Sequence, residues 1–123
     1  MAKTDTKNPN KRSDCPLACS LDLIGDKWSL LIIRDMLFFK KSTYNEFLDS
    51  PEGISTNILS NRLVKLTENG LITFSGGAKR KKYTLTKMGF DVKPILESVG
   101  MFGTKHFKGT KAYLQRQMKD FIV

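Results

Sequence analysis

The stretch from residue 42 to residue 70 constrains this chain most, because it has the pattern of two helices joined by a tight turn. Apolar residues at i, i+3 and i+4 predict a short first helix over 43–49. The turn at 50–53 combines Pro51, which lacks a backbone N–H, with Gly53, which tolerates positive φ. A helix is disfavoured through these residues, so we expect a second helix to begin after them.

The second helix is predicted over 55–68. Ser55 is a good N-cap. Gly70 stands where a C′ glycine belongs, and Leu71 can pack back on Leu66 as in a Schellman motif. Two helices that begin and end in this way have the geometry that places the second one in a DNA major groove. The apolar stripe of this helix consists of Ile58, Leu59, Leu63 and Leu66.

The polar side of the second helix carries groups that suit DNA. Hydroxyl and amide side chains donate and accept at base edges, Asn pairs with adenine, and Arg and Lys reach guanine or phosphate. An ordinary solvated face is the alternative interpretation, because most polar helix faces bind nothing. The residues off the apolar stripe are Thr56, Asn57, Ser60, Asn61, Arg62 and Lys65.

The charge of the chain indicates a polyanionic partner. Its 123 residues carry 21 Lys and Arg against 12 Asp and Glu, a net charge of +9, and 40% of them are hydrophobic, which is enough for one domain with a core. Charge alone does not distinguish DNA from RNA or a membrane surface.

No apolar run approaches the roughly 20 residues that span a bilayer, and the first residues lack a hydrophobic signal segment. We therefore expect a cytoplasmic protein, in which two cysteines do not form a structural disulfide framework.

The N-terminal part is predicted to be a mobile basic arm over 1–13, which either touches the DNA backbone or has no role. A helix then begins at Pro16, since proline is favoured at the first helical position. We expect its buried side to consist of Leu17, Leu21 and Ile24.

Cys15 is predicted to lie at the N-terminus of this helix, close in sequence to basic residues. Both features favour the thiolate form, although a small residue without a special role is the simpler interpretation. Cys19, one turn further on, is expected in the core. Two cysteines on one helix are poorly oriented to form a disulfide with each other.

The most hydrophobic segment, 27–39, is predicted to be the central helix. Apolar residues cover most of its circumference, which indicates burial on more than one side. Trp28 is expected to be a core residue rather than a base-stacking one.

A β-hairpin is predicted over 71–85, because short β-branched and aromatic runs flank Gly76 and Gly77. A run of cations is usually solvated surface. A basic hairpin directly after a candidate recognition helix, however, has the order of a winged helix, whose wing contacts phosphates or the minor groove. The cations that follow the hairpin tip are Lys79, Arg80, Lys81 and Lys82.

Two C-terminal helices are predicted, over 87–107 and 110–123, with Thr86 as the cap of the first. Pro94 predicts a kink or a break. These helices carry more apolar surface than a small winged helix needs for its own core. A second subunit would bury it, and a two-fold dimer matches palindromic DNA. The alternative is that they fold back on the first two helices.

No catalytic or metal-ligating constellation is recognisable. One histidine and two cysteines four residues apart give no zinc spacing. The sequence has no glycine-rich phosphate loop, no Gly-x-Ser-x-Gly and no His-Glu-x-x-His. We therefore expect no enzyme, no metal and no cofactor.

Several short motifs follow one another in a distinctive order. They are Cys15-Pro16, Ile24-Gly25, Lys27-Trp28, Gly53-Ile54-Ser55, Leu59-Ser60, Arg62-Leu63, Asn69-Gly70-Leu71-Ile72 and Tyr83-Thr84-Leu85-Thr86. In order and spacing they resemble the HxlR-type winged helix-turn-helix transcriptional regulators over roughly 15–107. The resemblance implies a mainly α fold with a small β-hairpin, in a bacterial-type cytoplasmic regulator that dimerises through its N- and C-terminal helices.

The resemblance also implies roles for single residues. Some members of the family sense electrophiles or oxidants through a cysteine at the position of Cys15, and others carry this cysteine with no shown sensing role. The chain departs from the family pattern at Asp26, where glycine is common, at Glu52, where proline is common, and at Phe102, where tryptophan is typical.

We therefore predict a homodimeric regulator that binds double-stranded DNA at an inverted repeat. Its winged helix-turn-helix domain spans 14–107, and 108–123 forms a helical extension in the dimer interface. The alternatives are a winged-helix protein-interaction module and an RNA-binding winged helix, which would stack bases on exposed aromatic residues that this sequence is expected to bury. Cys15 is the redox-sensing candidate. The predicted DNA-binding residues are Thr43, Ser55, Thr56, Asn57, Ser60, Asn61, Arg62, Lys65, Lys79, Arg80, Lys81 and Lys82.

Overall fold

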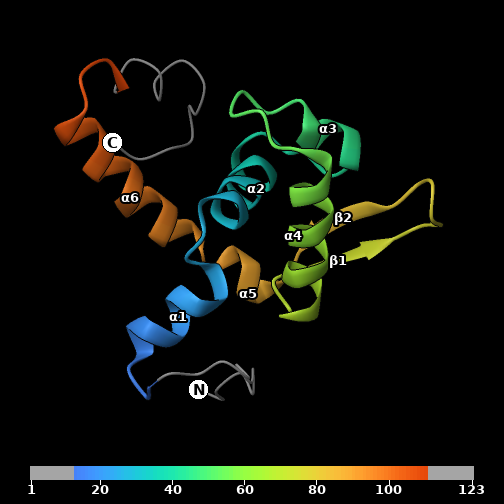
Figure 1. The fold of residues 1–123 in the computed structure, drawn as a ribbon, viewed down its shortest axis with the longest axis horizontal. Coiled ribbons are helices and arrows are strands. Elements are labelled where there is room, and N and C mark those ends of the chain that lie inside the picture. The colour runs from blue at the N-terminus through green and yellow to red at the C-terminus, as the bar shows by residue number, and fades with distance from the viewer. Residues whose placement is uncertain (1–12, 111–123) are drawn as a thin grey trace.

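The structure, a computed structural model, describes residues 13–110 (Figure 1). The basic arm predicted over 1–13 lies outside the described residues except for Ser13, and most of the extension predicted over 108–123 lies outside them too. The elements are α1 (Pro16–Ile24), α2 (Lys27–Phe38), α3 (Tyr44–Leu48), α4 (Thr56–Glu68), β1 (Ile72–Ser75), β2 (Lys82–Leu85), α5 (Lys87–Phe90) and α6 (Lys93–His106). The prediction of a mainly helical chain with one small hairpin is confirmed.

The helix α2 lies at the centre of the fold, as its all-round apolar sequence predicted. It contacts α4, α6 and β2 (Figure 1). Trp28 is only half-buried and packs against the edge of the core, with the Lys27 Nζ 5.1 Å from its ring centroid. The buried side chains of α2 include the apolar Ile32, Ile33, Met36 and Leu37, together with the charged Arg34 and Asp35.

The two-helix unit forms as predicted, with defined ends. Ser55 caps α4 through its hydroxyl, which accepts a hydrogen bond from the Ile58 backbone N–H. At the other end the Leu71 N–H donates to the Leu66 carbonyl over 3.0 Å, and Gly70 has a φ of 80°. These contacts are those of a Schellman motif, which stops α4 before β1 begins.

The hairpin that follows is antiparallel, with Ile72 opposite Leu85 and Ser75 opposite Lys82. Gly76 leaves β1 with a φ of 92°, a conformation that glycine adopts without strain. The sequence placed the four cations after the hairpin tip. The structure corrects this, because residues 79–81 lie in the connecting loop itself and Lys82 opens β2.

The predicted buried side of α1 is wrong for two of its three residues. Leu17 is 67% exposed and Leu21 54% exposed, whereas Ile24 is buried. The physical reason is that α1 extends away from the body of the subunit, so that its C-terminal residues Leu23 and Ile24 reach the core and the earlier ones do not (Figure 1). Cys19 is likewise only partly buried rather than in the core.

The C-terminal helix breaks as Pro94 predicted. The chain leaves α5 at Phe90 and starts α6 at Lys93, with Pro94 in the first turn, where its missing N–H costs nothing. The expectation that aromatic residues are buried is wrong for several phenylalanines. The exposed ones are Phe74, Phe90, Phe102 and Phe107.

Candidate nucleic-acid interface

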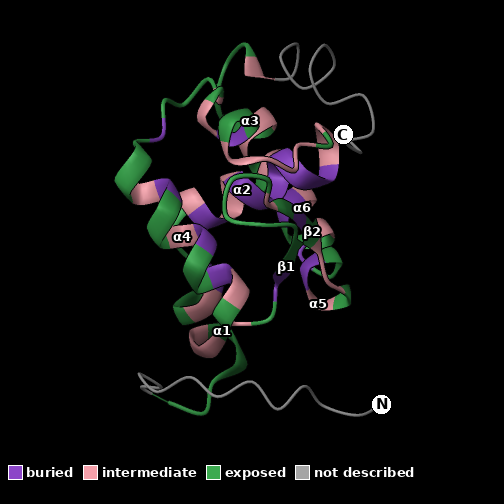
Figure 2. Cartoon of the chain, turned by 90° about the vertical axis from the view of Figure 1, so that its right-hand side faces the viewer, coloured by how far each residue is buried: buried purple, intermediate pink, exposed green. Residues whose placement is uncertain are grey.

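The outer side of α4 is exposed along its length, while Leu59, Leu63 and Leu66 are buried and hold the helix to the core (Figure 2). Five of the predicted base- or phosphate-contacting residues of this helix are exposed: Thr56, Asn57, Ser60, Asn61 and Lys65. An exposed row of hydroxyl, amide and ammonium groups on one helix can reach base edges and phosphates.

Within this face, several predicted residues already have partners. The Ser60 hydroxyl lies 3.3 Å from the Tyr44 hydroxyl, which also donates to the Thr56 carbonyl over 3.2 Å. The Asn61 Oδ1 accepts from Arg62 over 2.6 Å. The hydroxyl of Ser55 is used as the helix cap. These contacts order the helix face, and they leave the side chains of Thr56, Asn57 and Lys65 without a hydrogen-bond partner among residues 13–110.

Arg62 differs from the other predicted DNA-binding residues because it is half-buried and ion-paired. Its Nε donates to Asp26 Oδ1 over 2.9 Å. Partial burial alone would raise the pKa of Asp26, but hydrogen bonds from Ser29 and from Arg62 outweigh burial and hold that pKa below its ordinary value. Arg62 therefore joins α4 to the start of α2.

The N-terminus of α3 meets the wing on one side of the molecule. Thr43 caps α3 in a capping box with Glu46, so its hydroxyl is engaged locally. A hollow of about 350 Å³ separates this end of α3 from the basic loop. The residues that line it are Thr43, Tyr44, Asn45, Lys79, Arg80, Lys81 and Lys82. The structure thus brings the predicted Thr43 together with all four wing cations.

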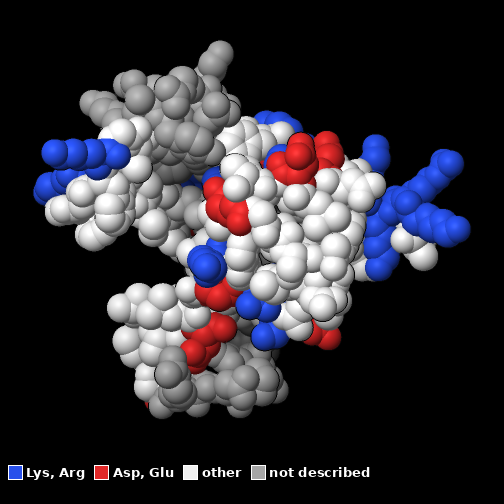
Figure 3. Space-filling view, turned by 45° about the horizontal axis from the view of Figure 1, so that its top comes forward, with Lys and Arg blue, Asp and Glu red and all other residues white. Residues whose placement is uncertain are grey.

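The wing carries its positive charge outward. Figure 3 shows Lys and Arg side chains gathered where the hairpin projects from the body. One of these cations, Lys81, lies over the ring of Phe74 with its Nζ 4.3 Å from the centroid. The other three, Lys79, Arg80 and Lys82, are exposed. A mobile point charge on an exposed loop suits phosphate contact rather than base recognition.

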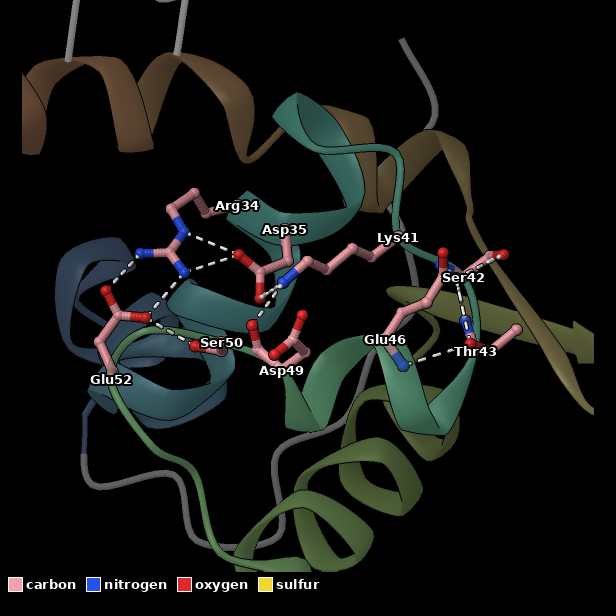
Figure 4. A network of polar contacts seen from close by, with 9 residues as sticks. All are labelled: Arg34, Asp35, Lys41, Ser42, Thr43, Glu46, Asp49, Ser50 and Glu52. Carbon is pink, nitrogen blue, oxygen red and sulfur yellow. Dashed lines mark hydrogen bonds and ion pairs between the residues drawn. The ribbon is translucent and has the colours of Figure 1, made fainter. Parts of the chain in front are cut away.

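Sequence reasoning missed a charge cluster beside this interface, in which the buried Arg34 and Asp35 are joined to Glu52 at the surface (Figure 4). Arg34 is 8% exposed and Asp35 2% exposed. Burial raises the pKa of Asp35 despite the nearby Arg34, whereas the hydrogen bond from Arg34 lowers the pKa of the more exposed Glu52 to about 2. The signal in the sequence was an Arg-Asp pair inside a helix that is otherwise apolar nearly all round.

Cys15 occupies the N-cap position of α1, as predicted, and is exposed. Its backbone N–H donates to the Ser13 hydroxyl over 3.2 Å, and the Cys19 thiol donates to the Ser13 carbonyl over 3.4 Å. Both cysteines are free thiols. Cys15 is thus accessible to reagents from solution.

Between residues 13 and 110, no three His, Cys, Asp or Glu side chains lie close enough together to hold a metal ion. None of the helices in that range is long and apolar enough to cross a bilayer.

Comparison with known proteins adds a family to this geometry. The sequence profile of the HxlR-like helix-turn-helix family matches residues 23–111. The chain is 31% identical over 93 residues to sll1512 of Synechocystis sp., an uncharacterised HTH-type transcriptional regulator, covering 73% of this chain and 68% of that protein. Its fold is similar to that of PA1607, a candidate transcription factor, with a TM-score of 0.70, 36% identity and coverage of 78% and 68% of the two chains. It is also similar to the redox regulator HypR in its oxidised form, with a TM-score of 0.63, 26% identity and coverage of 75% and 97%.

Proposed function

Because this chain belongs to the HxlR-like helix-turn-helix family, we propose that it is a transcriptional regulator that binds double-stranded DNA with sequence specificity as a homodimer. The observation that most supports this proposal is that α4, with its exposed polar side, is followed directly by the basic hairpin, and that α4 and the hairpin both pack against the core. A helix that enters the major groove beside a basic hairpin supplies both base contacts and phosphate contacts. The similar proteins from Synechocystis sp. and Bacillus subtilis are named as HTH-type transcriptional regulators. We propose no enzymatic role for this chain.

The interface divides into two kinds of contact. Thr56 and Asn57, at the exposed start of α4, are proposed to contact base edges, with Ser60 and Asn61 completing that face. Thr43 and Ser55 are the N-caps of α3 and α4. We propose that they contact phosphate together with the backbone N–H groups at these helix N-termini. The cations proposed to contact phosphate are Arg62, Lys65, Lys79, Arg80, Lys81 and Lys82.

The homodimer is proposed to form through α1 and α6. Leu17 and Leu21 on α1 are exposed, and so are Val99 and Phe102 on α6. A subunit that leaves such large apolar side chains uncovered on two terminal helices gains from covering them with a second copy. Two recognition helices related by a two-fold axis would then face two half-sites of an inverted repeat. A regulator of this type works in the cytoplasm, where bacterial DNA is located.

A redox response through Cys15 is proposed as a refinement of this function. Cys15 is exposed at the N-terminus of α1, where reagents in solution can reach it, and the similar protein HypR is described as a redox regulator. Mild oxidant is then expected to change DNA binding by the native protein and to leave the Cys15→Ser variant unchanged. An equal response in both proteins would exclude Cys15 as the sensor.

The test of DNA binding is the salt dependence of affinity for duplex DNA. If each subunit contacts roughly 4 phosphates, the log–log slope of the association constant against salt is about −7 for the dimer. A slope near zero would contradict the proposal and would favour the alternative, a winged-helix module that binds another protein.

A further inference from the structure

The buried guanidinium of Arg34 is held between two carboxylates, that of the buried Asp35 and that of Glu52 in the exposed turn (Figure 4). Its Nε and Nη2 donate to Asp35 Oδ1 over 2.9 and 2.6 Å. Its Nη1 and Nη2 donate to the two carboxylate oxygens of Glu52 over 2.8 and 2.9 Å. Arg34 and Asp35 belong to the central helix α2, whereas Glu52 belongs to the turn between α3 and α4. One buried cation therefore ties that turn to the core.

The tie is made close to the start of the recognition helix. Glu52 is followed by Gly53, which closes the turn through its N–H to the Ser50 carbonyl over 3.0 Å and has a φ of 70°. The Ser50 hydroxyl donates to Glu52 Oε1 over 2.7 Å. The next two residues are the buried Ile54 and the cap Ser55. The Glu52 carboxylate is thus held on the segment that leads directly into α4.

A second contact holds the other end of the same turn. Lys41 Nζ lies 3.7 Å from Asp35 Oδ2 and donates to the Asp49 carbonyl oxygen over 3.4 Å (Figure 4). Asp35 therefore contacts two cations, and through them α2 is linked to both Asp49 and Glu52. The four side-chain charges of Arg34, Lys41, Asp35 and Glu52 sum to zero, so each charge of the cluster is balanced within it.

Such a cluster is better suited to fixing geometry than to adding stability. The cost of removing charges from water offsets much of their attraction, and a buried ion pair is often no more stabilising than apolar residues of the same volume. A bidentate Arg–carboxylate pair does, however, restrict the relative position of the two groups in a plane. Sequence-specific contacts require side chains held to within about 0.5 Å, and supporting residues provide that precision.

We propose that Arg34 and Glu52 are positioning residues for sequence-specific DNA recognition, which hold the turn 50–53 so that the first residues of α4 meet base edges in the correct register. This inference rests on the proposed function, since it requires a DNA site that α4 recognises. It assigns the specificity of the protein in part to residues that contact no DNA. The wing cations lie outside the cluster, so binding to DNA of any sequence does not depend on it.

The test compares two variants that each remove one negative charge from the connection between α3 and α4. Glu52→Gln removes the charge that pairs with Arg34. Asp49→Asn is the matched control, because the Asp49 side chain is exposed and its contact with Lys41 uses the backbone carbonyl. The ligands are the duplex enriched by the wild-type protein from random DNA and a scrambled duplex of the same composition. The ratio of the two affinities measures discrimination.

Glu52→Gln is expected to reduce this ratio about tenfold, the lower end of the loss seen when residues that orient metal ligands are replaced. Affinity for the scrambled duplex is expected to equal that of Asp49→Asn. Equal ratios for the two variants, both folded, would overturn the inference. Wild-type protein that does not discriminate would instead contradict the proposed function itself.

Arg34→Lys keeps the positive charge and loses the planar, two-pronged geometry, so it provides a second test if Glu52→Gln does not fold at the assay temperature. Hydrogen exchange of the backbone amides at 56–58 gives a readout separate from global stability. Faster exchange there than in the Asp49→Asn control, at equal melting temperature, is expected for loss of positioning. Unchanged exchange together with unchanged discrimination would overturn the inference.

Discussion

Arg62 of the recognition helix is bonded to Asp26, the residue that caps the start of the central helix, through Nε and Oδ1 at 2.9 Å. The same carboxylate accepts from the Ser29 backbone N–H over 3.0 Å and from the Ser29 hydroxyl over 2.6 Å. The Asp26 side chain thus satisfies a backbone N–H in the first turn of α2 and also binds a cation of α4. The relationship carries a prediction about acid stability.

Asp26→Asn is expected to flatten the loss of stability on acidification. The pKa of Asp26 is lowered in the folded protein, so the charged form contributes stability above the unfolded value of about 3.9, and this contribution disappears as pH falls through the folded pKa. Asn keeps a good cap but does not titrate. The free energy of unfolding in urea, measured between neutral pH and acid, should converge for the two proteins at low pH. A difference that stays constant over the whole range would contradict this account.

Gly89→Ala is expected to destabilise the protein more than Gly70→Ala. A Cβ at Gly89 would collide with the Leu71 carbonyl oxygen and lie 2.8 Å from Leu85 Cδ2, and the backbone carbonyl cannot move aside cheaply. A Cβ at Gly70 meets nothing within 4 Å, so its cost is that of a left-handed φ, about 1–2 kcal/mol. Urea unfolding of both variants checks the order, and equal losses would show that the close approach at Gly89 is not energetically significant.

Replacing the four wing cations by Gln is expected to weaken binding to all duplexes alike. The cations concerned are Lys79, Arg80, Lys81 and Lys82. Each lost phosphate contact lowers the magnitude of the salt slope by about 0.9, with little change in sequence preference. Lys105→Gln with Lys108→Gln serves as a control, because both residues are exposed, Lys105 in the last turn of α6 and Lys108 shortly after it. An equal fall in slope per charge in the control would mean that net charge, not the wing, drives binding.

Val99→Glu is expected to convert a dimer into a monomer at micromolar concentration. Val99 is 56% exposed on α6, so the change costs the single subunit little, while a charge facing a second copy without a partner is unfavourable. Phe90→Glu on α5 is the matched control, since Phe90 is also 56% exposed. Sedimentation measures the outcome. A dimer that survives Val99→Glu and dissociates with Phe90→Glu would place the interface on another face.

The helix-turn-helix could be predicted from sequence because its signals are local. Pro51, Gly53, Ser55 and Gly70 each determine backbone geometry within a few residues, and the structure confirms the boundaries they imply to within a residue. Pro94 likewise broke the C-terminal helix where expected. Local backbone chemistry does not depend on what the rest of the chain does.

Predictions that depended on long-range packing were less successful. The spacing of Leu17 and Leu21 predicts that one side of α1 is covered. It does not indicate whether the covering residues belong to the same subunit. In this subunit both side chains are exposed. The pairing of Arg34 with Glu52 joins residues far apart in sequence, so no pattern along α2 could reveal it. The sequence already indicated that Glu52 departs from the family pattern. It did not indicate that Arg34 is the residue that pairs with it.

Selection of random duplex DNA by the purified protein under reducing conditions tests the central claim most directly. The account predicts enrichment of an inverted repeat whose half-sites lie about one helical turn apart, as expected for two recognition helices related by a two-fold axis. Recovery of DNA with no enriched sequence, at a salt concentration where binding is measurable, would contradict it, because the basic surface would then bind DNA without reading it.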